Sequence, residues 1–160
     1  AGKKVVARQR VTIVLLQLLS LAAVFFAPFD DRRELLVLSI SDLWRISGLV
    51  LIASGFTLMA WAEEVLGRLF STQVTIQEGH QLVTSGPYRH LRHPRYLGII
   101  LFNIGMALTF RSGLTLILTF ALTIVLLWRI HDEEKLLQEE FAAAWEAYAQ
   151  RSWRLVPFLY

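Results

Sequence analysis

The sequence predicts an all-α integral membrane protein with about four transmembrane helices, on the strength of two observations. Of its 160 residues, 55% are hydrophobic and 18% are charged, whereas soluble domains average about 45–50% apolar and about 25% charged residues. The apolar residues also gather into runs that approach the roughly 20 residues a helix needs to cross a bilayer. The length leaves room for one compact domain, so we interpret residues 1–160 as a single membrane domain.

Four apolar runs are expected to form the spans, at residues 11–29, 43–62, 94–110 and 114–130. The second run contains Gly48 and Gly55 beside Ser47 and Ser54, and small residues at such spacing let membrane helices approach closely. The short connection at 111–113 predicts that the third and fourth runs form a helical hairpin.

The placement of basic residues predicts the orientation of the bundle. Lysines and arginines precede the first run and fill the connection between the second and third runs, namely Lys3, Lys4, Arg8, Arg10, Arg68, Arg89, Arg92 and Arg95. Because cytoplasmic loops carry an excess of Lys and Arg, both termini and the long middle segment are expected in the cytoplasm.

The last part of the chain differs from the spans in composition. Residues 131–150 are rich in Glu and Ala, with Leu137, Phe141, Trp145 and Tyr148 at helical spacing. This pattern is typical of an amphipathic helix that lies on the membrane or caps the bundle.

The segment 66–98 carries the polar residues that need an explanation. Charged and imidazole side chains beside a bilayer are candidates for function by default. Gly86-Pro87 indicates a turn, and His93-Pro94 indicates that the third helix begins near Pro94, with Tyr96 in its first turn. Taken singly, the arginines here are better explained as the cytoplasmic flank of a span.

Two classes of ligand are not expected. The chain has four histidines and no cysteine, and no spacing among the histidines completes a metal site. Nucleic-acid binding is not expected either, because the basic residues adjoin a membrane span rather than covering a soluble face.

Arg129 and Glu133 lie four residues apart, where the fourth span ends. Such spacing alone gives a helix-surface ion pair of about 0.2–0.5 kcal/mol. The predicted hairpin, however, would bring this pair level with His93 and Tyr96. Polar groups that converge beside apolar surface are the usual form of a ligand site.

Three motifs resemble the isoprenylcysteine carboxyl methyltransferase family, whose superfamily includes phospholipid N-methyltransferase relatives. They are "HQLVTSGPYRHLRHPRYLG", "RIHDEEKLL" and "FAAAWEAYAQRSWRLVPFLY", in this order. The resemblance runs from about Leu66 to the end of the chain. One departure is Phe141-Ala142, where relatives often have Phe-Gly.

The resemblance implies S-adenosyl-L-methionine as the cofactor and an amphiphilic or lipid-like methyl acceptor. It assigns Arg129 to the substrate and makes Arg129 and Glu133 the catalytic pair. The cofactor-binding residues that it implies are Gln73, His80, Gln81, Leu82, Val83, Tyr88, His93, Pro94, Arg95, Tyr96 and Glu133.

Methyl transfer from a sulfonium is an in-line displacement, in which alignment can supply roughly 7–11 kcal/mol. A prenylcysteine-type carboxylate would need only a cation such as Arg129 to orient it. A phospholipid amine or a small thiol would need a base, for which Glu133, Glu134 and His93 are candidates. Tyr88 and Tyr96 could offer cation–π contacts to the sulfonium.

Two other classes of protein stay open on the residues alone. The family is related in fold to sterol reductases that use NADPH, so topology by itself does not fix the cofactor. A non-enzymatic membrane scaffold whose basic segment binds anionic lipid is the other alternative.

Overall fold

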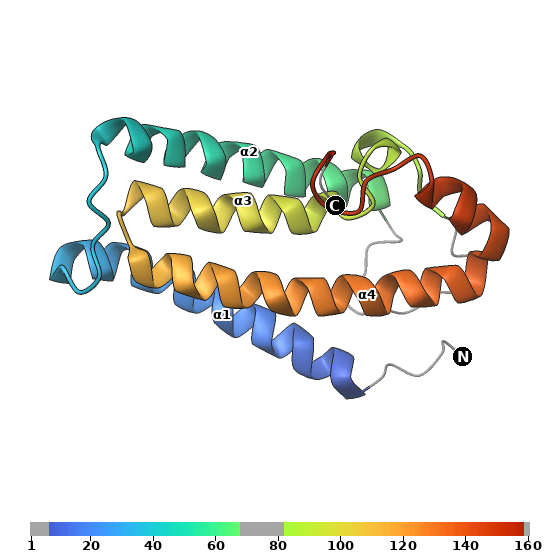
Figure 1. Ribbon diagram of the computed structural model, residues 1–160, viewed down its shortest axis with the longest axis horizontal. Helices are drawn as coiled ribbons and strands as arrows, with labels where there is room; N and C mark the ends of the chain where they lie inside the picture. The colour runs from blue at the N-terminus through green and yellow to red at the C-terminus, as the bar shows by residue number, and fades with distance from the viewer. Residues whose placement is uncertain (1–6, 68–81, 159–160) are drawn as a thin grey trace.

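The computed structural model describes residues 7–67 and 82–158 as a bundle of helices (Figure 1). The elements are α1 (Ala7–Arg33), α2 (Asp42–Leu66), the 3-10 helix η2 (Gly86–Arg89), α3 (Pro94–Thr109) and α4 (Gly113–Ala149). Within these ranges the β-structure is limited to two isolated bridges. The all-α class predicted from the sequence is confirmed.

The closest helix pair is α2 with α3, because glycines face each other across it. A Cβ atom on Gly55 would lie 2.6 Å from the Gly98 carbonyl oxygen, and one on Gly105 would lie 2.6 Å from the Gly48 carbonyl oxygen. Both glycine pairs therefore allow direct backbone contact. The close approach predicted from Gly48 and Gly55 is confirmed, and its partner is α3.

The other side of the bundle is formed by α4 and α1. In Figure 1, α4 runs back antiparallel to α3 after the short connection at 110–112, and α1 crosses below α4. α3 packs more extensively on α2 than on α4, and α1 packs mainly on α4. α3 and α4 are thus joined by a tight turn, but each packs more extensively on another helix, α3 on α2 and α4 on α1.

The turn end of the bundle is held together by Asp30, whose side chain is fully buried. Its carboxylate accepts hydrogen bonds from the Leu36 amide at 2.7 Å and the Ser112 hydroxyl at 2.7 Å. These bonds join the α1–α2 connection to the start of α4, far from the polar end of the molecule.

Three helices are long and apolar enough to cross a membrane: Val11–Arg33, Asp42–Leu66 and Gly113–Ala149. The third predicted span, at 94–110, corresponds to α3, which has only 16 residues. At about 1.5 Å per residue it is shorter than the roughly 30 Å hydrocarbon core. The expected number of full-length spans is reduced to three in the described part of the chain.

α4 does not end where the fourth span was expected to end. Its regular part before residue 142, at 113–141, is roughly 44 Å long at about 1.5 Å per residue, well beyond the hydrocarbon thickness. The separate helix predicted at 131–150 is therefore the outer part of α4. The reason is local: residues 131–141 contain neither glycine nor proline, so nothing breaks the helix. A kink comes at Ala142, where φ is 40° and ψ is −115°.

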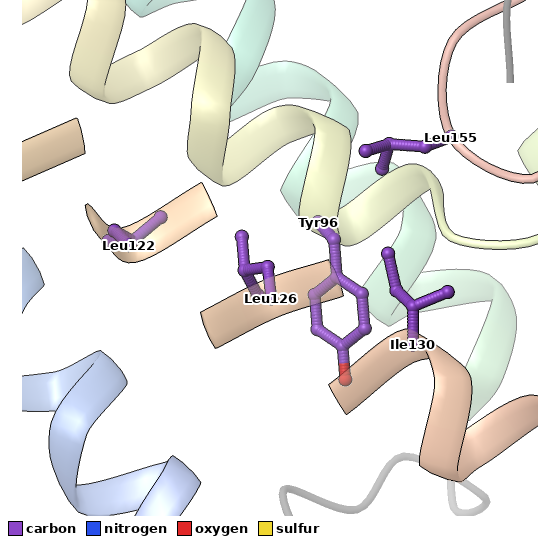
Figure 2. Close-up of a cluster of buried hydrophobic side chains, with 5 residues drawn as sticks. All are labelled: Tyr96, Leu122, Leu126, Ile130 and Leu155. Atoms are coloured by element: carbon purple, nitrogen blue, oxygen red, sulfur yellow. The ribbon is translucent and has the colours of Figure 1, made fainter. Parts of the chain in front are cut away.

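The core beside the polar end is built from α3, α4 and the residues after α4. Figure 2 shows Tyr96 of α3 beside Leu126 and Ile130 of α4, with Leu155 close by. Leu155 is only 4% exposed. The segment 150–158, hereafter the C-terminal tail, is therefore packed into the bundle.

Candidate functional site

The site is centred on the start of α3. His93 is the N-cap residue and Pro94 occupies the first turn, where a missing N–H costs no hydrogen bond. The helix start predicted near Pro94, with Tyr96 in the first turn, is confirmed. Gly86 has a φ of 57°, a left-handed conformation that suits glycine, and this confirms the predicted turn before Tyr88.

Tyr96, Arg129 and Glu133 form one hydrogen-bonded unit across α3 and α4. The Arg129 Nε donates to the Tyr96 hydroxyl at 2.7 Å and to the Glu133 carboxylate at 3.1 Å. The Tyr96 hydroxyl donates to the same carboxylate. Because Arg129 is only 4% exposed, its charge is matched at close range rather than by water.

His93 lies between two carboxylates. Its Nδ1 is 3.5 Å from Glu133 Oε2 and its Nε2 is 3.3 Å from Glu134 Oε1. Burial disfavours the charged ring, but the hydrogen bonds and charges of both glutamates outweigh it and raise the pKa of His93 above its usual value. The ring also stacks on Tyr96, with centroids 5.6 Å apart.

Glu134 is shared by three cationic side chains from two parts of the chain. Besides His93, its carboxylate contacts Arg92 Nη1 at 3.1 Å and Arg154 Nη2 at 2.7 Å. Arg154 belongs to the C-terminal tail. The side chain of Glu134 is buried, so these contacts replace the solvation it has lost.

Tyr88 forms the next part of the site. It is buried in η2, and its carbonyl oxygen accepts a hydrogen bond of 2.7 Å from the Tyr148 hydroxyl of α4. Burial raises the pKa of the Tyr88 phenol well above its usual value, so this hydroxyl stays protonated. Leu82 and Val83 precede it and are half-buried.

The structure brings together one part of the predicted site. His93, Tyr96 and Arg129 each contact Glu133, so the four residues form one connected cluster. Arg95 instead pairs with Glu63 of α2, at 2.8 Å. Pro94 is completely buried at the helix start. The predicted ligands Gln73, His80 and Gln81 lie outside the described residues, and the cofactor-binding roles of the whole set stay predictions.

Two residues of the cluster were not singled out from the sequence. Arg154 and Tyr148 lie far along the chain from 88–93, and their contacts with that segment have no local signal. Glu134 adjoins Glu133 in the sequence, and that adjacency was the available pointer to its place in the site.

A cavity of about 510 Å³ opens beside the cluster, on the Glu134 side. Its lining is mainly polar and comes from the outer part of α4, the start of α3 and the C-terminal tail: Arg92, His131, Glu134, Lys135, Gln138, Trp145, Glu146, Ala149, Gln150 and Arg154. Within 7–67 and 82–158, no group of three or more His, Asp or Glu side chains has an arrangement that could hold a metal ion.

An all-helical bundle with three helices long enough to span a bilayer, and buried ionisable side chains at one end, defines a multi-pass membrane protein with an enzyme-like site. Comparison with known proteins identifies the family. Residues 47–139 match the isoprenylcysteine carboxyl methyltransferase (ICMT) family, and the chain belongs to this family. The resemblance drawn from the motifs is confirmed.

The relatives agree with this assignment. A probable protein-S-isoprenylcysteine O-methyltransferase of Oryza sativa subsp. indica is 31% identical over 147 residues, which cover 86% of this chain and 75% of the relative. Protein-S-isoprenylcysteine O-methyltransferase B of Arabidopsis thaliana is 35% identical over 72% of this chain and 61% of its own length.

A solved structure has the same fold. The eukaryotic intramembrane Ras methyltransferase ICMT matches with a TM-score of 0.67 and 28% identity, over 72% of this chain. The match spans 43% of that larger chain. Methyltransferase is therefore the enzyme class of this protein, as the motifs implied.

Proposed function

We propose that the chain is an integral-membrane, S-adenosylmethionine-dependent methyltransferase that esterifies the carboxylate of an amphiphilic, prenylcysteine-type acceptor. The names of the rice and Arabidopsis relatives support the acceptor class. One observation of the site supports the same choice: both of its carboxylates are already held in ion pairs.

Glu133 is held by Arg129, Tyr96 and His93, and Glu134 by His93 and two further arginines. A carboxylate engaged in this way is a weak base, since each cation stabilises its ionised form. An amine or thiol acceptor must lose a proton, whereas an acceptor carboxylate attacks as the anion it already is. The paired state of both glutamates therefore favours carboxyl methylation.

The residues present fit the expected cofactor in chemical type. When bound, S-adenosylmethionine supplies an electrophilic methyl group on a sulfonium. Glu133, Tyr88 and Tyr96 provide the carboxylate and the aromatic faces that suit such a cation. His93 and Tyr96 are held by stacking and hydrogen bonds, which supports their proposed role in holding the cofactor.

Arg129 has the chemistry to orient the acceptor. Its guanidinium is a planar fork of donors whose geometry matches a carboxylate, and Tyr96 and Glu133 hold it in place. Burial of this group excludes water, which strengthens its attraction for an anion. The chain thus contributes alignment and charge, not proton transfer.

The test is methyl transfer from labelled S-adenosylmethionine by the purified protein in detergent. A prenylcysteine, a phospholipid amine and a small thiol are offered in parallel. We expect label in the prenylcysteine as a base-labile ester. Label in the amine or thiol alone would show that the acceptor is wrong, and a failure of the protein to bind the donor by calorimetry would refute the proposal as a whole.

His93 and His90 supply a matched pair for the same assay. His93 is buried between the glutamates, while His90, three residues earlier, is exposed. His93→Ala should weaken donor binding, and His90→Ala should leave it unchanged. Equal affinities in the two variants would place the donor elsewhere.

A further inference from the structure

The C-terminal tail returns to the segment just before α3, and the two segments form backbone hydrogen bonds. The Arg92 amide donates to the Trp153 carbonyl at 2.8 Å, the Trp153 amide donates to the His90 carbonyl at 2.9 Å, and the His93 amide donates to the Arg154 carbonyl at 3.2 Å. Leu155 then enters the core beside Tyr96 and Ile130 (Figure 2). Arg154 is therefore anchored on both sides.

The side chain of Arg154 reaches Glu134 at 2.7 Å, the shortest of the distances from this carboxylate to its three cations. Glu134 is buried and His93 more so, with side chains 9% and 5% exposed. Removing one partner from a buried charge network leaves the remaining charges undercompensated, and the side chains then rearrange or change protonation.

Glu134 in turn fixes the ring of His93. One ring nitrogen faces Glu134 and the other faces Glu133, so the ring cannot turn over without exchanging both contacts. The same ring lies at 8° to the plane of Tyr96. The orientation of His93 thus depends on a carboxylate that Arg154 and Arg92 hold in place.

We propose that Arg154 is a positioning residue, which acts through Glu134 to hold the His93 ring against Tyr96 and Glu133. The C-terminal tail then contributes to the geometry of the site. This inference rests on the proposed function, in that the methyl donor binds beside His93. The contact that carries this role is the ion pair of Arg154 with Glu134, at 2.7 Å.

Three variants in the full-length protein test the inference: Arg154→Gln, Arg154→Lys and, as a matched control, Arg151→Gln. Arg151 lies in the same tail and is exposed. Donor binding is measured by calorimetry with S-adenosylmethionine, beside thermal unfolding in the same detergent. We expect the dissociation constant to rise about tenfold in Arg154→Gln, a size ordinary for coupled charge networks. Arg154→Lys should recover part of this loss because it keeps the charge, and Arg151→Gln should match the parent.

The decisive readout is a double-mutant cycle with His93→Gln. If Arg154 acts through His93, then Arg154→Gln has no further effect on donor affinity once His93 is replaced. A purely structural role would lower affinity or stability equally in both backgrounds, and that result would overturn the inference. So would a folded Arg154→Gln variant that binds the donor as tightly as the parent.

Two further measurements distinguish a failure of the proposed function from a failure of this inference. The parent protein is measured first: a parent that binds no donor defeats the proposed function, whereas a parent that binds while Arg154→Gln is unaffected defeats only this inference. If Arg154→Gln does not fold, Glu134→Gln enters the same cycle, because it removes the contact from the other side. Additivity of Glu134→Gln with His93→Gln would then reject the role.

Discussion

At the scale of single residues, the charge of His93 is set by its neighbours. Glu133 and Glu134 of α4 face its two ring nitrogens, and Tyr96 of α3 stacks on the ring. The two glutamates also form ion pairs with arginines, namely Arg92, Arg129 and Arg154. With a carboxylate facing each nitrogen, the charged form of the ring is favoured and its pKa is raised. We therefore propose that His93 holds the two glutamates in place and is not the general base.

This arrangement predicts a pH dependence of stability. The folded pKa of His93 is raised above the unfolded value of 6.5. The ion pairs therefore contribute fully below about pH 6.5, and the contribution is lost as the pH rises through the higher folded value. Thermal unfolding in detergent should show that the melting temperature of the parent falls as the pH is raised above about 6.5. The fall should be smaller in His93→Gln, and identical slopes would contradict the assigned charge.

Arg129 supports a second prediction at this scale. Lysine keeps the charge but lacks the guanidinium Nε–H, which donates to both Tyr96 and Glu133 in arginine. Arg129→Lys should lower methyl transfer by about 100-fold, the cost of a misplaced orienting group. The control is Arg89→Lys, at an exposed position of η2. A membrane scaffold would tolerate both changes, so equal behaviour of the two variants would favour that alternative.

At the scale of elements, α2 and α3 are locked together by glycines. A Cβ on Gly55 would meet the backbone of Gly98 and Phe102, at 2.6 and 2.7 Å, and backbone cannot move aside as a flexible side chain does. The glycines therefore set the position of α3, and with it the position of His93 and Tyr96.

Gly55→Ala should consequently destabilise the protein by about 1–3 kcal/mol, the usual range for overpacking. Ser54→Ala, at the exposed neighbouring position, should have little effect. Both are measured by thermal unfolding in detergent. An unchanged melting temperature in Gly55→Ala would mean that the two backbones are not in contact.

The kink in α4 predicts a substitution that raises stability, in contrast to Gly55→Ala. Ala142 has a φ of 40°, in the left-handed region where a side chain is strained and glycine is not. Relatives often carry glycine at this place in the motif, as noted above. Ala142→Gly should therefore stabilise the fold by about 1 kcal/mol, while Ala143→Gly, in a regular exposed turn, should destabilise it by about 0.5–1 kcal/mol. Loss of stability in both would argue against the kink.

At the scale of the whole molecule, the site lies at one end of the bundle and the α1–α2 connection at the other (Figure 1). Large apolar side chains point outward along the helices, among them Phe25, Phe56 and Phe120, which are 66%, 63% and 71% exposed. Lipid would cover these surfaces. We propose that the site end faces the cytoplasm, as the distribution of basic residues predicts.

The chain contains no cysteine, so single cysteines report the orientation without interference. Ser85→Cys lies at the site end and Ser39→Cys in the α1–α2 connection, both at exposed positions. In intact cells, a membrane-impermeant maleimide should label Ser39→Cys and spare Ser85→Cys until the membrane is permeabilised. The reverse pattern would invert the proposed topology.

The features that could be predicted from the sequence are those with a local physical cause. Apolar runs predict helices that cross a membrane, because lipid offers no hydrogen bonds and the backbone must satisfy its own within a helix. Pro94 predicts the start of α3, because proline restricts the backbone conformation of the residue before it and suits a first helical turn. The spacing of Arg129 and Glu133 places them on one helix face, and they do pair, at 3.1 Å.

What only the tertiary structure decided are the contacts between distant parts of the chain. The choice of α2 as the main partner of α3 and the meeting of Arg154 with Glu134 depend on how whole surfaces fit together. Close packing of this kind leaves no periodic trace in either segment. The amino-acid sequence by itself determined a helical membrane protein with family motifs at its polar end, and the fold determined which charges meet there.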